Sequence, residues 1–460
     1  MADNRYEMDM CSGPVLNKII IFTLPMICSS MLQLLFNAAD IIVVGRFAGQ
    51  TALAAVSSTG ALINLIVNLF MGLSVGVSVT VARHYGAHEF KDVSDTVHTA
   101  VLMSLVGSVI CCIMGVLLAR PLLELMGSPY DVIDQATLYV RIYFLGMPAS
   151  MFYNFGSGIL RAVGDTKRPL YFLTIAGVIN ALLNLLFVIR YSMGVAGVAL
   201  ATIISQYISA VLVCYCLMRS EGSYRLHWKQ LAFHKEKAFP IMRIGFPAGI
   251  QGSVFSISNM AIQSSINSFG STAMAGSGAA ANIEGFIYVA INSVAQAALS
   301  FTSQNIGARK YERIGKICRA CLMLATGIGL VLGVAAYLAR YTLLGFYSPD
   351  PTVITEGIKR LTIIALTYFT CGYMDTFSCM LRAMGKSLMP MIVTIVGVCG
   401  LRILWVTFVL PMDPRFEVLF LSYPISWVLT ASFHFVYYTI TKRRLIRSAP
   451  PLEEAAEVGA

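Results

Sequence analysis

Long apolar runs are the feature that most constrains the fold of this chain. Its 460 residues are 57% hydrophobic and only 12% charged, whereas soluble globular chains carry about 25% charged residues. A run of about 20 apolar residues forms a helix long enough to cross the hydrocarbon core of a bilayer. We therefore expect an all-α polytopic membrane protein with twelve transmembrane helices, near residues 17–45, 52–80, 94–119, 134–156, 169–190, 194–218, 240–266, 273–301, 314–338, 353–379, 388–410 and 417–441.

Lys and Arg are unevenly distributed among the loops that connect these runs. They concentrate at residues 219–237, 309–319 and 442–447, and the alternate loops contain few of them. Because basic loops stay in the cytoplasm, we expect both termini to be cytoplasmic and the protein to lie in the plasma (inner) membrane. The net charge of +10 then reflects topology and contact with lipid headgroups, and no nucleic-acid partner is needed.

The second half of the chain repeats the first. Leu160–Gly164 (LRAVG) matches Leu381–Gly385 (LRAMG) at an offset of 221 residues, and Pro25 matches Pro247 at an offset of 222. Six runs per half is an even number, so the halves keep the same orientation and form parallel repeats. Both LRAxG copies precede turn-forming and basic residues, which favours a tight glycine turn over a substrate contact.

The repeat predicts how the chain is divided. Two six-helix lobes of this kind form a cleft between them and reach alternating access by rocking one lobe against the other. The expected parts are an N-terminal lobe at 1–218, a basic cytoplasmic linker at 219–239, a C-terminal lobe at 240–441 and a cytoplasmic tail at 442–460.

One carboxylate interrupts the first apolar run. Asp40 follows Ser30, Gln33 and Asn37 at steps of three and four residues, which places all four on one face of a helix. An acid at the bilayer centre costs about 2.5–3.5 kcal/mol on insertion scales, so it rarely lies there without a function. A helix-packing stripe is the alternative, but it leaves the acid unexplained. The duplicated run has Ile262 at the position of Asp40, so the repeat itself does not require the acid.

At these residues the chain resembles the multidrug and toxic compound extrusion (MATE) family. The resemblance rests on Asn37 and Asp40, on Gln304–Ala308 (QNIGA) and on both LRAxG loops, and it covers residues 14–441. It implies a V-shaped transporter of two lobes that exports organic, often cationic, compounds in exchange for inward Na⁺ or H⁺. Among the branches it is more similar to the bacterial DinF/MepA-like group, because residues 252–256 lack the acid of the NorM group.

The same resemblance implies a cation site in the N-terminal lobe. The family pattern has a first-span Asp, an Asn on the fourth span, an Asn-x-x-x-Asp pair on the fifth and a Thr on the sixth. This sequence departs from the pattern at Asn184, which stands in place of the second acid and leaves the choice of Na⁺ or H⁺ open. The expected coupling residues are Asp40, Asn37, Asn154, Asn180, Asn184 and Thr202. A Na⁺ ion would be held by Asp40, Asn180, Asn184 and Thr202, because hard cations take oxygen ligands.

Two further acids lie inside apolar runs of the second half. Asp375 is the repeat partner of Asn154, and Glu284 lies on the eighth span. Each is expected either to contact a cationic substrate or a second ion, or to pair with Arg402. The predicted substrate cleft contains Gln33, Asn259, Glu284 and Asp375.

Other classes of function fit less well. A lipid-linked oligosaccharide flippase of the same superfamily would need several basic residues in its cleft, and intramembrane Arg is scarce here. An ATP-driven pump would need a Gly-x-x-x-x-Gly-Lys-Ser/Thr loop, which is missing. No nucleophile–base spacing indicates an enzyme. We expect a monomeric antiporter without a cofactor whose partners are small organic substrates and membrane lipids.

Overall fold

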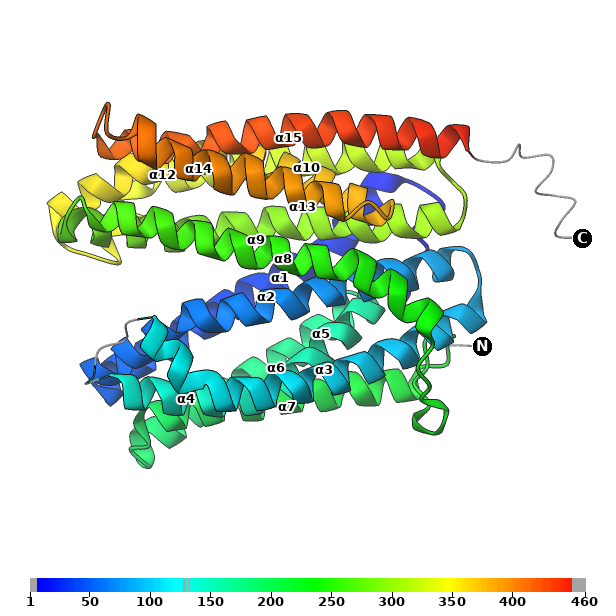
Figure 1. Cartoon of the computed structure of the whole chain (residues 1–460), viewed down its shortest axis with the longest axis horizontal. Helices are drawn as coiled ribbons and strands as arrows, with labels where there is room; N and C mark the ends of the chain where they lie inside the picture. Colours follow the sequence, from blue (N-terminus) through cyan, green and yellow to red (C-terminus); the bar gives the residue numbers. More distant parts are fainter. Residues whose placement is uncertain (1–5, 127–129, 131, 449–460) are drawn as a thin grey trace, which may run out of the picture. The chain divides into compact units, whose positions relative to one another are not determined.

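The computed structural model of the chain describes residues 6–126, 130 and 132–448. These residues form long helices joined by loops, and none of them belongs to a β-strand (Figure 1). The all-α fold expected from the apolar runs is therefore confirmed. A helix covers most of each of the twelve predicted spans.

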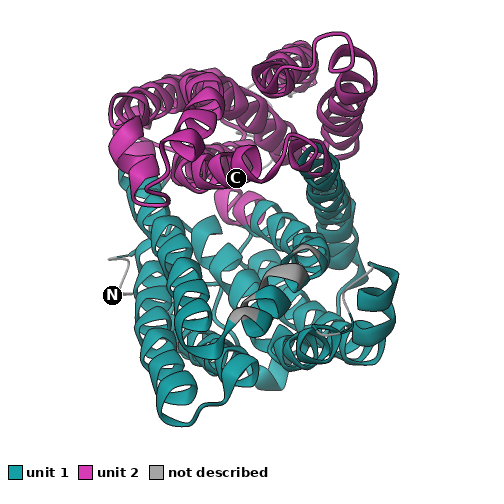
Figure 2. Cartoon of the chain, turned by 90° about the vertical axis from the view of Figure 1, so that its left-hand side faces the viewer, with its two compact units in different colours: residues 1–9, 21–81, 89–263 teal, residues 10–20, 82–88, 264–460 magenta. Residues whose placement is uncertain are grey.

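The helices group into two compact units (Figure 2). Among the described residues, unit 1 comprises 6–9, 21–81 and 89–263, and unit 2 comprises 10–20, 82–88 and 264–448. This grouping follows packing rather than the repeat, so the division at residues 219–239 stays a prediction.

Unit 1 contains most of α1 and α2, together with α3 to α8. Their bounds are α1 (Val15–Val43), α2 (Gln50–Gly86), α3 (Phe90–Leu125), α4 (Ile133–Leu145), α5 (Met147–Ala162), α6 (Lys167–Asn184), α7 (Gly194–Arg219) and α8 (Lys235–Asn267). The predicted span 134–156 is two helices, because α4 ends at Leu145 and Pro148 lies in the first turn of α5, a position that suits proline.

Unit 2 contains the remaining helices. Their bounds are α9 (Ser271–Gly307), α10 (Glu312–Leu338), α11 (Arg340–Gly345), α12 (Pro351–Ala383), α13 (Leu388–Thr394), α14 (Leu401–Leu404) and α15 (Phe416–Arg447). The helix α12 packs along α9, α10 and α15. Ala280, Ile287 and Ile291 of α9 form the centre of its hydrophobic core with Ala325 and Leu361.

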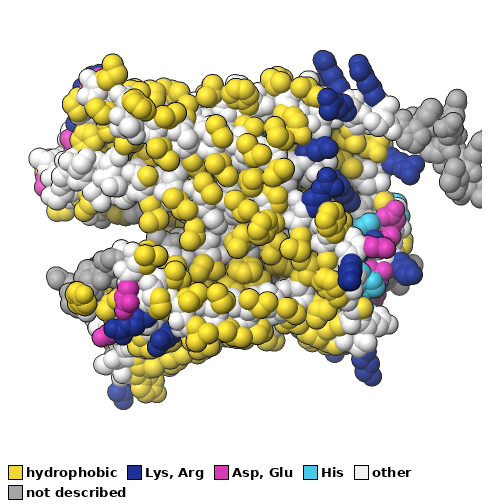
Figure 3. Space-filling model, in the orientation of Figure 1, with side chains coloured by type: hydrophobic (Ala, Val, Ile, Leu, Met, Phe, Trp, Pro, Cys, Tyr) yellow, Lys and Arg dark blue, Asp and Glu magenta, His cyan; other side chains and the backbone are white. Residues whose placement is uncertain are grey.

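The outer surface is that of a membrane protein. Among the described residues, nine helices are long and apolar enough to cross a bilayer. Hydrophobic side chains cover the flanks of the helices, and charged side chains lie near the helix ends (Figure 3). Large apolar residues such as Leu117, Val211 and Val331 are exposed, which suits contact with lipid. The protein is therefore a multi-pass membrane protein.

Glycine residues allow α2 and α8 to pack closely within unit 1. A Cβ atom on Gly72 would lie 2.6 Å from the carbonyl oxygen of Gly245, and one on Gly245 would lie 2.6 Å from the Cα of Leu73. Gly72 and Gly76 on α2 face Gly245 and Gly249 on α8. Both helices carry a Gly-x-x-x-Gly spacing, which permits close contact between membrane helices.

Both LRAxG copies end their helix in a glycine turn. Gly164 has φ +98° and Gly385 has φ +79°, a conformation that side chains with a Cβ rarely adopt. After each glycine, the next backbone N–H donates back into the helix, from Asp165 to the Leu160 carbonyl at 2.9 Å and from Lys386 to the Leu381 carbonyl at 2.9 Å. The predicted turns are confirmed, and they form the usual glycine C-cap.

Candidate coupling and substrate sites

Asp40 and two asparagines lie together in unit 1. The side-chain amide of Asn184 donates to a carboxylate oxygen of Asp40. The same amide nitrogen also donates to Oδ1 of Asn180, at 3.2 Å. Asn180 and Asn184 are one turn apart on α6 and are buried, whereas Asp40 is partly buried on α1. Asp40, Asn180 and Asn184 are thus brought together as the resemblance implied.

Departures from regular α-helix adjoin this group. The π-helical turn η1 (Val44–Ala48) begins four residues after Asp40, and η2 (Leu185–Arg190) begins directly after Asn184. Such turns insert a residue into the helix and frequently accompany functional sites. Oδ1 of Asn184 is buried without a hydrogen-bond partner, although buried polar atoms are normally bonded.

Tyr139 is a member of the group that the sequence did not reveal. It lies on α4, is 9% exposed and is close enough to Asp40 to interact with its charge. Its ring lies 6.3 Å from that of Tyr143. Tyr139 and Tyr143 are four residues apart, a helical spacing that was visible in the sequence, but nothing there indicated which helix they face.

Other predicted coupling residues make contacts along their own helices. The amide of Asn154 donates to the Ser150 carbonyl at 2.8 Å, and the Thr202 hydroxyl donates to the Val198 carbonyl at 3.0 Å. Asn154 also lines a small cavity whose wall includes Met71. On α1, Asn37 and Gln33 are exposed. The roles predicted for Asn37, Asn154 and Thr202 stay predictions.

Glu284 lies in a charged pair inside unit 2. Its carboxylate accepts from Nη2 of Arg360 at 2.9 Å and from Nε at 3.1 Å. Nη1 of Arg360 donates to the Ser277 hydroxyl at 2.9 Å, and both Glu284 and Arg360 are buried. The partner of Glu284 is therefore Arg360 of α12, which lies within the predicted span 353–379, and the pairing considered with Arg402 is replaced by this one.

Arg402 is completely buried among aromatic rings. Its guanidinium carbon lies 3.9 Å from the centre of the Tyr423 ring and 5.8 Å from that of Trp427. Nε donates to the Ser426 hydroxyl at 3.3 Å. Cation–π contacts of this kind can hold a buried guanidinium, so the environment of Arg402 is aromatic and hydroxyl-bearing.

The remaining predicted cleft residues are separate from these groups. Arg382 and Asn292 of α9 lie close enough to Asp375 to interact with its charge, and its Oδ2 atom is buried without a hydrogen-bond partner. Asn259 is exposed on α8, which belongs to unit 1 up to residue 263. The predicted cleft thus consists of residues in different settings, of which Glu284 is held in an ion pair.

The comparison with known protein families decides the class of this protein. The MatE family model matches residues 25–186 and again residues 247–407, one match in each repeat. The chain belongs to the MatE family. The resemblance stated from the sequence is confirmed, and the protein is a transporter rather than an enzyme.

Relatives and solved structures agree with the MatE assignment. The chain is 28% identical to "Probable multidrug resistance protein YoeA" of Bacillus subtilis over 91% of its own length and 92% of the relative. It is 23% identical to the "FAD transporter" of Shewanella oneidensis, with 86% and 87% covered. The structure "Outward-facing conformation of a multidrug resistance MATE family transporter of the MOP superfamily" has the same fold, with a TM-score of 0.89, 23% identity, and 95% of this chain and 98% of that chain covered.

The geometry of unit 1 defines what this MatE protein can do chemically. The Asn184 amide, which donates to the Asp40 carboxylate, is neutral. A carboxylate in a poorly solvated place is unfavourable when charged and is relieved by a proton or a cation. The Glu284 carboxylate already faces the charge of Arg360. Asp40 is therefore the better candidate for reversible binding of an ion.

Proposed function

We propose that the protein is a secondary active antiporter that exports organic, cationic drugs or toxic metabolites by alternating access. Inward movement of H⁺ or Na⁺ drives the export. Support comes from the MatE assignment and from a relative named as a probable multidrug resistance protein. The observation that carries the proposal is Asp40, an intramembrane carboxylate that accepts a hydrogen bond from the neutral amide of Asn184.

The arrangement at Asn184 favours H⁺ as the coupling ion. One amide nitrogen donates both to Asp40 and to Oδ1 of Asn180, so a hydrogen-bond donor lies where a cation bound to both oxygens would stand. A proton on Asp40 needs no such space. The family pattern has a second carboxylate at this position, and replacing it by Asn184 removes one formal negative charge.

Na⁺ is the second candidate, and the same residue supports it. Turning the Asn184 amide over exchanges its nitrogen and oxygen. Oδ1 of Asn184, which is buried without a partner, would then face Asp40 and Asn180. Three oxygens would surround the ion, and Thr202 is the predicted fourth ligand. Hard cations prefer such ligands.

Exchange follows if ion and substrate exclude each other at Asp40. When the site is occupied, its charge is neutralised and closure around it is tolerated. When it is empty, the charged carboxylate attracts either water or a cationic compound. Because the two ligands compete for one charge, binding of either one releases the other, which is the thermodynamic requirement for antiport.

The topology and assembly belong to the same proposal. Because basic loops stay in the cytoplasm, both termini are cytoplasmic in this proposal. The membrane is the plasma (inner) membrane. The protein acts as a monomer, with lipids as its surroundings. The lobes 1–218 and 240–441 rock against each other about the linker 219–239.

A cationic substrate has two alternatives, FAD and a lipid-linked oligosaccharide. The FAD transporter carries an anion by its name, and a lipid-linked oligosaccharide carries a pyrophosphate. Both would need free positive charge in the translocation path. Arg360 is matched by Glu284, which favours the cationic class.

The experiment is export from proteoliposomes under single ion gradients. Purified protein is reconstituted, and transport of a cationic dye is followed with a pH gradient alone and with a Na⁺ gradient alone. We expect transport with the pH gradient. Transport with the Na⁺ gradient alone would identify Na⁺ as the coupling ion. Transport that depends on neither gradient would refute the antiporter. Accumulation of FAD in place of the dye would refute the cationic class.

A further inference from the structure

The segment between α7 and α8 is bound to unit 1 at two places. It is polar and basic in sequence, yet Tyr224 and Leu226 are each only 2% exposed. The backbone N–H of Leu226 donates to the carbonyl of Leu217, at the end of α7, at 3.0 Å. The segment is therefore packed against the helices rather than extended into solvent.

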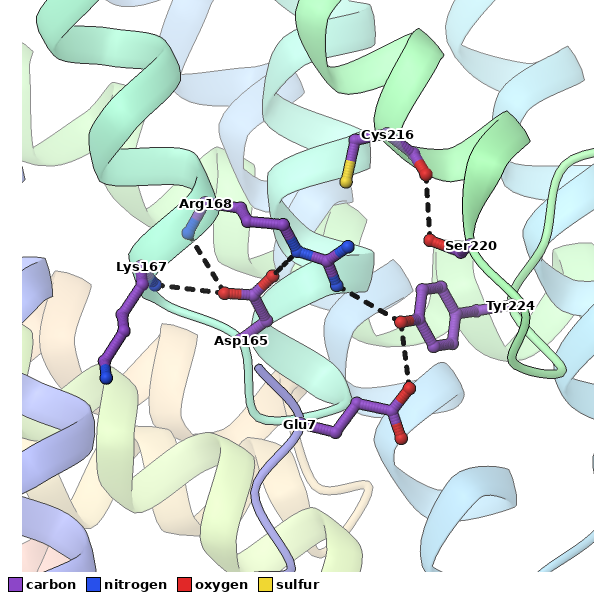
Figure 4. A network of polar contacts seen from close by, with 7 residues as sticks. All are labelled: Glu7, Asp165, Lys167, Arg168, Cys216, Ser220 and Tyr224. Carbon is purple, nitrogen blue, oxygen red and sulfur yellow. Dashed lines mark hydrogen bonds and ion pairs between the residues drawn. The ribbon is translucent and has the colours of Figure 1, made fainter. Parts of the chain in front are cut away.

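The first attachment is centred on Tyr224 (Figure 4). Its hydroxyl donates to Oε1 of Glu7 at 2.9 Å and accepts from Nη2 of Arg168 at 3.2 Å. Arg168 is paired with Asp165, whose carboxylate also accepts from the backbone N–H of Lys167 at 3.0 Å at the start of α6. The network joins the residues before α1, the first LRAxG loop and the segment after α7.

The hydrogen bond between Arg168 and Tyr224 keeps both of its groups unchanged in mild acid. Burial raises the pKa of Tyr224 to about 12, so its hydroxyl keeps its proton at neutral and mildly acidic pH. The guanidinium of an Arg side chain is always charged. The hydrogen bond from Arg168 to Tyr224 consequently keeps its donor and its acceptor throughout this range.

The second attachment is to α3, three residues further along the segment. The backbone N–H of His227 donates to Nε2 of His98 at 3.1 Å, and the N–H of His234 donates to Oγ1 of Thr99 at 3.1 Å. The rings of His98 and His227 are stacked, with centroids 6.4 Å apart. His98 is 2% exposed.

These contacts fix the protonation state of His98. Its Nδ1 lies 2.7 Å from the carbonyl oxygen of Ser94, so Nδ1 must carry a hydrogen. Its Nε2 faces the N–H of His227 and must accept. A neutral imidazole offers one donor and one acceptor, whereas a protonated one offers two donors and no acceptor. The observed geometry therefore requires neutral His98.

We propose that His98 is an acid-sensitive latch that holds the α7–α8 segment on α3. Protonation at Nε2 turns the acceptor into a donor that faces another donor, and it places a positive charge beside His227. Histidine is the side chain that ordinarily changes charge between about pH 5 and 8. Acid thus detaches the segment at His227 and leaves it attached at Tyr224.

The charged groups around His98 come from three elements. They are Asp92 and Asp95 on α3, His227 and His234 in the segment, and Lys237 at the start of α8. Asp92 pairs with Lys237, and Asp95 lies 3.6 Å from Nε2 of His234.

Protonation of His234 has the opposite effect on the attachment of the segment to protonation of His98. Protonation of His234 strengthens its pair with Asp95, but this pair is partly exposed, and exposed ion pairs contribute little to stability. The buried contact of His98 decides the direction.

The latch goes beyond the proposed antiport and can fail independently of it. Its effect falls on the first turn of α8, which begins at Lys235. In the orientation proposed above, His98 would respond to cytoplasmic pH, and an inward flow of protons would release the segment.

Hydrogen exchange of the full-length protein in detergent tests the latch. Labelling times are scaled to the intrinsic exchange rate at each pH, and the amides of Leu226 and His227 are compared. Between about pH 8 and pH 5, we expect the protection of His227 to fall by about tenfold, the equivalent of one lost hydrogen bond. We expect Leu226 to keep its protection. If the protection of the Leu226 and His227 amides changed with pH in the same way, or changed in neither, the proposal would be overturned by the wild-type protein alone.

Two variants assign the effect to His98. In His98→Gln the side-chain oxygen takes the place of Nε2 as an acceptor that mild acid does not protonate, so protection of His227 should become independent of pH. In His227→Phe the backbone N–H and the ring contact are kept, so the pH dependence at that amide should persist. If the pH dependence at the amide of residue 227 persisted in His98→Gln, or was lost in His227→Phe, His98 would not be the group responsible.

Discussion

Two intramembrane carboxylates, Asp40 in unit 1 and Glu284 in unit 2, have partners of different charge. The Asn184 amide donates to Asp40, and the guanidinium of Arg360 donates twice to Glu284. A buried ion pair is held in place, because removing one partner leaves an uncompensated charge. A carboxylate with a neutral partner can gain and lose a proton or a cation. The comparison separates a carboxylate suited to coupling from one suited to structure.

The largest expected effect is that of Asp40→Asn. The variant keeps the size of the side chain and removes the group that takes the coupling ion, so we expect gradient-driven efflux to fall to the uncoupled background. Efflux from proteoliposomes measures this. Asp413→Asn, in an exposed acid that pairs with Arg415, is the control and should behave as wild type. Full gradient-driven efflux by Asp40→Asn would show that Asp40 does not bind the coupling ion.

Arg360→Met tests the other carboxylate. It leaves Glu284 buried without its partner, which we expect to destabilise the protein by about 3–5 kcal/mol. Thermal unfolding in detergent measures the loss. The adjacent Lys359→Met removes a more exposed pair with Glu356 and should cost at most about 1 kcal/mol.

The double variant Arg360→Met, Glu284→Gln sharpens this result. Removing both charges should restore most of the stability, since no unpaired charge remains. If gradient-driven efflux nevertheless disappeared in a stable double variant, Glu284 would have a coupling role and the division between the two units would be wrong.

Asn184→Asp makes the site of unit 1 more like the family pattern. Two carboxylates close together share protons, because both cannot be charged at little cost. We expect the pH at which coupled efflux is half-maximal to move upward by about one unit. The pH profile of dye efflux measures the shift, with Asn17→Asp at an exposed residue as the control. An unchanged profile would show that residue 184 does not act on Asp40.

Tyr139→Phe should have the smallest effect. It removes a hydroxyl from a side chain near Asp40 and keeps the ring. Losing a polar interaction of about 1 kcal/mol or less corresponds to at most roughly a fivefold decrease in coupled efflux. Initial rates measure it, against Tyr191→Phe at an exposed position. An equal response of the two variants would remove Tyr139 from the site.

Much of the fold followed from local sequence properties. Length and hydropathy located the helices, and glycines 164 and 385 marked turns that the structure contains. The break between α4 and α5 was missed, because an apolar run does not reveal where the backbone stops being helical. The π-helical turns after Asp40 and Asn184 were missed for the same reason.

The site was predictable where one helix decides the geometry and not where two helices meet. Asn180 and Asn184 are one turn apart on a single helix, and the resemblance brought Asp40 to them. The partner of Glu284 was not predictable, because Arg360 lies 76 residues away in the sequence and the contact depends on how α9 and α12 pack. Tyr139 was missed because its position depends on how α4 packs.

Antiport through Asp40 requires that an ion and a cationic substrate compete for its carboxylate. Proton release from purified protein, measured in weak buffer when a cationic dye is added, tests it without reconstitution. We expect about one proton per protein molecule from the wild type, none from Asp40→Asn, and the wild-type release from the double variant Arg360→Met, Glu284→Gln. Undiminished release from Asp40→Asn, or release that disappears in the folded double variant, would contradict competition at Asp40.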